Sequence, residues 1–226
     1  MVCCQTATVS PTEAAQFLAH GTLFLYFDAM KTFKVFVAES VFPEDIRKGD
    51  REGQVVQAIC GVLHRPITYE VVNNKEALCK AIKTASEGNY NIFHLSCHGD
   101  AQGVQLADET ELSWDDLAKC FQSLVSIPAA LVISSCVGGD HGVSRAFKNS
   151  KRRPQVIFGT EGKKKRRITF PGACITWPIL YTSLARAGIT RNSFKDAVKK
   201  MNLITRHRFV YRRWDGEQYR RYPSKE

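Results

Sequence analysis

Two residues of this sequence, His98 and Cys136, are of the types that form a nucleophile and its base. His98 follows the strand-like stretch 92–96, and Cys136 follows the apolar stretch 129–135. Gly99 comes directly after His98, and Val-Gly-Gly comes after Cys136. A cysteine attacks as its thiolate, and a nearby histidine can remove the thiol proton. Glycine permits close backbone approach and leaves its N–H open to a developing oxyanion, so the pattern suggests nucleophilic catalysis.

Other functions for the same residues remain open. A zinc site would take its ligands from Cys97, His98, Cys136 and His141. Successive side chains on a strand point to opposite faces, so Cys97 and His98 are not expected to share an ion. We therefore predict no metal and no cofactor in the chemistry. A histidine at a strand end is also commonly structural, and a buried cysteine is usually inert. We expect His94 to be such a core residue.

The elements that must position these residues alternate along the chain. Hydrophobic periodicity predicts helices over 11–20, 49–64, 74–86, 113–124, 142–150, 171–188 and 190–202. Strands are predicted over 22–29, 33–40, 66–72, 90–97, 129–136 and 154–160. The second is expected to be the hairpin partner of the first or a return across the edge of the sheet. A small hairpin is expected over 103–113 and a basic one over 208–223, around Asp215-Gly216. Apolar strands interleaved with helices predict an α/β fold, a three-layer sandwich with a mostly parallel central sheet.

Composition and charge limit the class of protein. The chain has 226 residues, of which 44% are hydrophobic and 24% charged, as expected for one soluble domain over 1–226. It has no apolar run long enough to span a membrane and no signal-peptide pattern, so no membrane association is expected. Eight cysteines without CxxC pairs indicate reduced thiols and a cytoplasmic location.

The net charge of +10 is concentrated in a few segments. The terminal hairpin region interleaves arginines with aromatic residues, a pattern that can bind nucleic acid: Arg206, Arg208, Phe209, Tyr211, Arg212, Arg213, Trp214, Tyr219, Arg220, Arg221 and Tyr222. The same alternation also describes a strand with one packed face. Nucleic-acid binding is therefore kept as an alternative without a recognised motif behind it.

A family resemblance rests on two segments. "FHLSCHGDAQGVQLADETELSWDDLAKCF" and "PAALVISSCVGGD" resemble the CHAT domain of the caspase-like (clan CD) cysteine proteases. The caspase pattern QAC-x-G is only partly met, and the spacing from His98 to Cys136 is shorter than the roughly 50 residues of caspases. The resemblance implies a cysteine endopeptidase that acts on proteins, with Cys136 as nucleophile and His98 as its base. The N–H groups of Gly99 and Cys136 would then form the oxyanion hole.

Specificity and activation are predicted from charge. A carboxylate in the P1 pocket would select lysine or arginine, and the candidates are Asp28, at the end of the predicted strand 22–28, and Asp140. A turn-forming or capping role is the alternative for both. Candidate processing sites lie in two basic segments: Lys151, Arg152, Arg153, Lys163, Lys164, Lys165, Arg166 and Arg167. Solvated loops that recruit an acidic partner are the alternative for these segments.

The partners expected from the resemblance are a protein substrate and an upstream activating protease or sensor protein. A role in bacterial antiviral defence is suggested by the same analogy. An inactive caspase-like scaffold is the remaining alternative, and the presence of both His98 and Cys136 argues against it.

Overall fold

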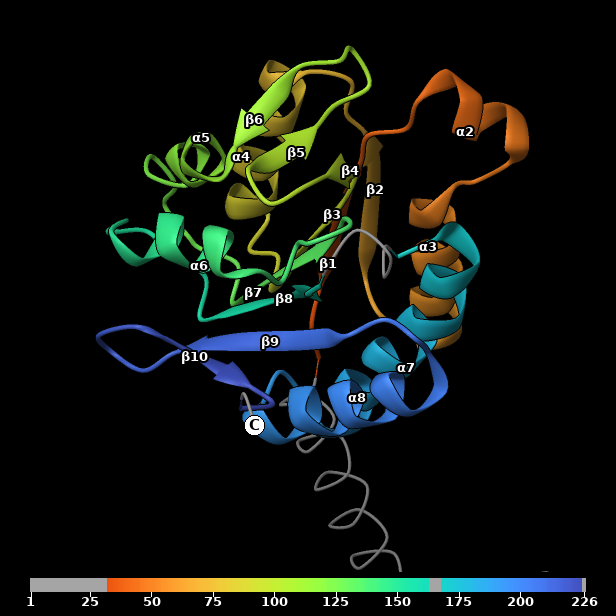
Figure 1. The fold of residues 1–226 in the computed structure, drawn as a ribbon, viewed down its shortest axis with the longest axis vertical. Helices are drawn as coiled ribbons and strands as arrows, with labels where there is room; N and C mark the ends of the chain where they lie inside the picture. Colours follow the sequence, from red (N-terminus) through yellow and green to blue (C-terminus); the bar gives the residue numbers. More distant parts are fainter. Residues whose placement is uncertain (1–31, 163–167, 225–226) are drawn as a thin grey trace, which may run out of the picture. The chain divides into compact units, whose positions relative to one another are not determined.

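The described part of the chain covers residues 32–162 and 168–224 of a computed structural model (Figure 1). Residues Phe33–Glu226 make up one unit by themselves. The predicted helix 11–20, the predicted strand 22–29 with Asp28, and the basic residues 163–167 lie outside the described residues. The prediction of a single domain over 1–226 therefore stays a prediction.

Seven strands form the main sheet in the order β10-β9-β8-β7-β3-β1-β2. These strands are β1 (Val35–Glu39), β2 (Ile67–Val71), β3 (Ile92–Ser96), β7 (Ala130–Ser134), β8 (Val156–Thr160), β9 (Phe209–Trp214) and β10 (Tyr219–Tyr222). The strands β1, β2, β3, β7 and β8 run parallel to one another. The terminal hairpin β9–β10 extends the sheet next to β8 with antiparallel pairing. The predicted mostly parallel sheet and terminal hairpin are confirmed.

The central strands are apolar runs because both of their faces are covered. Every residue of β1, β3, β7 and β8 is buried, as expected for parallel strands between two helical layers. The strand β1 pairs with β2 on one side and with β3 on the other. The option that residues 33–40 form a hairpin with 22–29 is therefore wrong, because both edges of β1 are already occupied.

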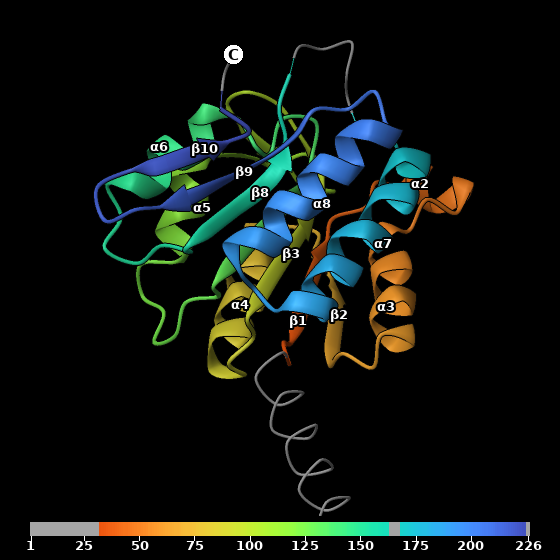
Figure 2. The same ribbon diagram turned by 90° about the horizontal axis from the view of Figure 1, so that it is seen from below.

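Two apolar cores lie on opposite faces of the sheet. One holds buried residues of α4 (Lys75–Glu87), α5 (Trp114–Cys120) and α6 (His141–Lys148). The other holds buried residues of α3 (Glu52–Val62), α7 (Phe170–Ala187) and α8 (Arg191–Ile204). Figure 2 shows α3, α7 and α8 together on one side of the strands. The six helices predicted over this part of the chain are present, and the three-layer sandwich is confirmed.

A small second sheet stands after β3. It consists of β4 (His98–Gly99), β5 (Gly103–Gln105) and β6 (Glu111–Ser113) in antiparallel pairs. The predicted hairpin over 103–113 is present as β5 and β6. The predicted strand 90–97 is interrupted, however: β3 ends at Ser96, and His98 begins a strand of another sheet.

A short helix that the sequence analysis did not predict, α2 (Pro43–Lys48), connects β1 to α3. It starts with proline at its first position, where the missing N–H is not needed. Gly49 ends it with φ of 78°, a left-handed conformation that favours glycine. Asp45 on this helix and Asp50 just beyond it are thereby carried to the end of the sheet where β1 finishes.

Two cysteines depart from the expectation of reduced thiols. Cys79 of α4 and Cys120 of α5 form a disulfide with a Cα–Cα distance of 5.4 Å. The two helices pack on the same face of the sheet, which brings together residues 41 positions apart. Spacing along the sequence gave no signal for this pair. Among the described residues, no helix is long and apolar enough to cross a bilayer.

Candidate active site beyond the carboxyl ends of β3 and β7

The strand order reverses between β1 and β3. From β1 the chain moves outward to β2, and from β3 it moves the other way through β7 to β8. Ligands of such sheets bind beyond the carboxyl ends of the strands at the reversal. In the register of the sheet, Ser96 at the end of β3 aligns with Glu39 of β1 and Ser134 of β7. Glu39 therefore ends a strand at the reversal, and Asp28 lies outside the described residues, so its predicted place at the cleft stays a prediction.

Two pockets meet at this edge, and His98 and Cys136 line both of them. The larger, of about 450 Å³, extends from Cys136 along the small sheet β4-β5-β6. The smaller, of about 220 Å³, lies over the ends of β1, β3 and β7 and is also lined by residues 168–170. The candidate nucleophile and base thus stand between two cavities, where a chain crossing from one to the other would pass both.

The turn that carries Cys136 is held by the end of β8. The hydroxyl of Thr160 donates to the carbonyl oxygens of Ser135, at 2.8 Å, and Cys136, at 3.1 Å. The N–H of Gly139 donates back to the carbonyl of Thr160 at 2.8 Å. A Cβ at Gly138 would come within 2.5 Å of Ile133, so the turn has no room for a side chain there. The Val-Gly-Gly motif therefore serves the close packing of this turn.

His98 contacts a carboxylate that the sequence analysis missed. Its Nε2 lies 3.1 Å from Oδ2 of Asp45 on α2, and its ring meets that of Phe42 edge-on at 4.9 Å. A hydrogen on Nε2 that is donated to Asp45 leaves Nδ1 as the proton acceptor. The His98 side chain is 54% exposed, so its ring is accessible from the pockets. The sequence offered no signal for Asp45, which lies on an unpredicted helix far upstream.

Gly99 and Ser135 bring the two strand ends into contact. A Cβ at Gly99 would lie 2.8 Å from the carbonyl of Gly103 and 3.2 Å from the Ser135 hydroxyl, so only glycine fits. That hydroxyl is buried and has no hydrogen-bond partner among the described residues. Buried polar groups are usually paired, and exceptions are common at functional sites. The residue directly before Cys136 thus carries a buried hydroxyl without a partner among the described residues.

Carboxylates line both pockets. Asp100, Glu111 and Asp116 line the larger one, and Glu39, Asp45, Asp50 and Glu52 line the smaller. No lysine or arginine is among the described residues that line either pocket. This is notable in a chain of net charge +10. Both pockets are therefore suited to positively charged groups.

Most of the carboxylates in the smaller pocket are already engaged. Glu39 accepts from the hydroxyl of Tyr69 at 2.6 Å and from the N–H of Gly53 at 2.9 Å. Burial raises the pKa of Glu39 above its ordinary value. Asp45 is held by His98. Glu52 is bonded to the core, as described next. Asp50 makes no side-chain hydrogen bond to any described residue, so its carboxylate is available to a ligand.

Glu52 connects the smaller pocket to the core. Its Oε1 accepts from the indole N–H of Trp177 at 2.8 Å and lies 3.1 Å from Nε2 of His94. Its Oε2 accepts from the hydroxyl of Ser134 at 2.9 Å. Nδ1 of His94 lies 2.7 Å from the hydroxyl of Tyr181. His94 is fully buried, which confirms it as a core histidine.

Cys97 lies closer to the site than expected. It lines the smaller pocket together with His98, because the strand breaks at this residue and alternation no longer separates the two. Its side chain also packs against the apolar core that includes α4, α5 and α6, which agrees with the structural role expected of it. Burial raises the pKa of its thiol well above the ordinary range, and the negative charges of Glu52 and Cys136 add to this. Cys97 thus stays protonated and is a poor nucleophile.

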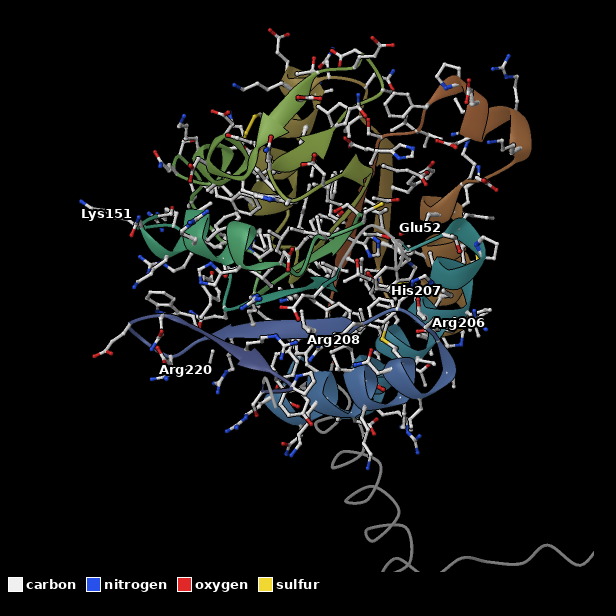
Figure 3. All side chains as sticks on the ribbon, viewed as in Figure 1. Glu52, Lys151, Arg206, His207, Arg208 and Arg220 are labelled. Carbon is white, nitrogen blue, oxygen red and sulfur yellow. A yellow bond between two sulfur atoms is a disulfide. The ribbon has the colours of Figure 1, made fainter. Side chains whose placement is uncertain are left out.

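The remaining predicted residues lie elsewhere. Asp140 occupies the N-cap position of α6 and is not part of the lining of either pocket. Lys151 (Figure 3) and Arg152 are exposed after α6. Arg153 lies over the ring of Trp214 at 4.0 Å. The described residues contain no group of three or more metal-ligating side chains placed to hold an ion.

Comparison with known proteins found likenesses among solved structures but none by sequence. No protein-family model matches the chain, and no curated protein matches it. Among solved structures, the Arg specific cysteine proteinase gingipain R aligns with a TM-score of 0.47 and 11% sequence identity. The alignment covers 76% of this chain and 43% of the gingipain chain, so this chain spans less than half of that protein.

Proposed function

We propose that this protein is a cysteine endopeptidase of the caspase-like type, with Cys136 as nucleophile and His98 as its base. The observation that carries the proposal is the position of these two side chains. They come from the ends of neighbouring parallel strands, and both line the two pockets that meet between them. A peptide lying across both pockets would have its scissile bond beside both residues.

The reaction follows from these roles. Nδ1 of His98 removes the thiol proton of Cys136, and the thiolate sulfur attacks the peptide carbonyl carbon. The N–H groups of Gly99 and Cys136 donate to the oxyanion of the tetrahedral intermediate. The imidazolium then protonates the departing amine, and a thioester remains on Cys136. Water, deprotonated by His98, hydrolyses the thioester and regenerates the thiol. The carboxylate of Asp45 stabilises the imidazolium in between.

The preferred substrates have a lysine or arginine at P1. Support comes from the carboxylates of the smaller pocket, among which Asp50 is the one not engaged by a described residue. A basic P1 group would form a charge-assisted hydrogen bond with Asp50. Asp50 therefore replaces Asp140 as the candidate for selecting P1, since Asp140 is not in the pocket lining.

Activation by cleavage is part of the proposal. The basic residues 163–167 directly precede Ile168, Thr169 and Phe170, which line the smaller pocket. Their charge suits a basic-P1 protease, either this protein or an upstream enzyme. The CHAT resemblance adds the proposed setting, a bacterial antiviral effector switched on by a protease or sensor protein.

Covalent labelling tests the proposed chemistry. Acyloxymethyl-ketone peptides with lysine, arginine, aspartate or leucine at P1 are incubated with the intact and the proteolytically nicked protein. We expect labelling by the lysine and arginine probes, and its loss in Cys136→Ala and His98→Ala. Cys174→Ala is the matched control, since it removes a half-buried thiol outside both pocket linings and should label normally. Absence of labelling with every probe would favour a binding or scaffold protein instead.

A further inference from the structure

The terminal hairpin contributes a buried arginine to the site. Arg212 lies in the middle of β9 and is only 4% exposed. Its Nε donates to the carbonyl oxygen of Gly139 at 2.9 Å. Gly139 is in the turn that carries Cys136, so a side chain from the far end of the sequence holds the turn of the candidate nucleophile.

The charge of Arg212 is balanced by Glu161. The guanidinium donates from a second nitrogen to Oε1 of Glu161 at 2.9 Å. Arg221 of β10 also donates to this carboxylate, and Arg208 lies 3.9 Å from it. Burial alone would raise the pKa of Glu161, but the three arginines outweigh it and the pKa is lowered. The carboxylate therefore stays ionised at neutral pH and fixes the orientation of Arg212.

The two ends of the nucleophile turn are thus held separately. Thr160 fixes the carbonyls of Ser135 and Cys136 at its start, and Arg212 fixes Gly139 at its end. Rotation of this turn would move both the sulfur of Cys136 and the adjoining N–H. A displacement of about 1 Å from a remote substitution can reduce turnover about 100-fold. Loss of the hydrogen bond from Arg212 leaves Gly139 with the bond from its N–H to the carbonyl of Thr160.

We propose that Arg212 is a positioning residue for Cys136, with Glu161 as the group that positions Arg212 in turn. The inference rests on the proposed peptidase function. It also gives a role to part of the basic terminal hairpin: Arg208, Arg212 and Arg221 are directed to Glu161. Arg212 is buried and cannot contact nucleic acid.

Steady-state kinetics separate a positioning role, which lowers kcat, from a role in substrate binding, which raises KM. Arg212→Met removes both hydrogen bonds, while Glu161 keeps Arg208 and Arg221, so no buried charge is left unpaired. We expect kcat to fall 10- to 100-fold at nearly constant KM, with the magnitude taken from the cost of such misplacement. Arg212→Lys should recover part of kcat, because an ammonium can still reach one acceptor. Wild-type kcat in Arg212→Met, or a change in KM alone, would overturn the proposal.

Arg220→Met is the matched control. Arg220 lies on β10 of the same hairpin, is exposed and, within the described part of the chain, pairs only with the exposed Asp215 of the turn (Figure 3). Its loss should leave kcat unchanged. A thermal melt of each variant checks that it is folded. If Arg212→Met does not fold, Glu161→Gln provides the test, since the amide keeps the shape of the carboxylate and should lower kcat in the same direction.

The rate of Cys136 alkylation by iodoacetamide is a readout that does not depend on peptidase activity. It is measured in a Cys174→Ala background by mass spectrometry of the Cys136 peptide. We expect the rate to change at least threefold in Arg212→Met and not in Arg220→Met. If wild type cleaves no peptide but the rate still changes, the peptidase proposal fails and the positioning role stands. Normal peptidase activity with an unchanged rate would overturn the positioning role alone.

Discussion

Nε2 of His98 lies 3.1 Å from Oδ2 of Asp45, a residue 53 positions earlier in the sequence. The contact joins the small sheet after β3 to the helix after β1, across the edge where the two pockets meet. It fixes the tautomer in which Nδ1 accepts a proton, which the proposed reaction requires. Asp45 thereby adds a carboxylate to the proposed nucleophile and base at the same edge.

The first prediction concerns this carboxylate. Asp45→Asn should lower kcat for peptide hydrolysis by about 100-fold, because the amide can donate to Nε2 and favour the wrong tautomer. The measurement is steady-state kinetics on a basic-P1 peptide. Glu44→Gln is the control, because Glu44 is exposed in the first turn of the same helix, and it should leave kcat unchanged. Equal kcat in Asp45→Asn and wild type would show that Asp45 takes no part.

The second prediction concerns P1 selection. Asp50→Asn should reduce kcat/KM for lysine and arginine substrates by about 10-fold or more, since a charge-assisted hydrogen bond is lost. Asp50→Lys should shift the preference towards acidic P1 residues. Profiles on a peptide library measure both effects. Asp140→Asn serves as the comparison, and a loss of basic-P1 preference in that variant rather than in Asp50→Asn would reverse the assignment.

The third prediction concerns the buried acid under the pocket. Glu52→Ala removes the acceptor of three donors, the indole of Trp177, the hydroxyl of Ser134 and the ring of His94. A buried donor without a partner costs about 1–3 kcal/mol. The free energy of unfolding in urea should therefore fall by at least about 3 kcal/mol. Glu44→Ala should change it by less than about 0.5 kcal/mol, and similar values for both variants would contradict the network.

The fourth prediction is a pH dependence. Glu161 has a lowered pKa in the folded protein, so its stabilising contribution is present above its ordinary pKa of 4.5. It is lost as the pH falls below 4.5 through the folded value. Glu161→Gln should thus have a lower Tm than wild type at pH 7, with a smaller difference at pH 3. A Tm difference that does not change between these two pH values would contradict the ion-pair cluster.

The main sheet and the position of its functional edge could be predicted from the sequence. Apolar stretches around 92–96 and 129–135 indicated buried parallel strands, and the rule for strand ends placed His98 and Cys136 at one edge. The break at Cys97 could not be predicted, because the sequence around it looks like one continuous strand. Only the structure shows that His98 pairs in a second sheet. The pairing of β1 depends in the same way on contacts between distant strands.

The residues that surround His98 and Cys136 could not be predicted from the sequence. Asp45 and Asp50 lie around a short helix whose sequence gives no apolar periodicity. Arg212 looked like one arginine of a basic, aromatic strand, and only the sheet order places it beside the nucleophile turn. The Cys79–Cys120 disulfide requires knowledge of how α4 and α5 pack. Each of these features depends on three-dimensional proximity between segments far apart in the chain.

The most direct test of the central claim is peptide hydrolysis by the purified protein, before and after nicking at the basic segments. An internally quenched peptide with a single arginine is incubated with wild type, Cys136→Ala and His98→Ala, and the products are identified by mass spectrometry. The account predicts cleavage after the arginine by wild type and none by either variant. Cleavage that persists in Cys136→Ala, or that is absent from wild type in both forms, would contradict it.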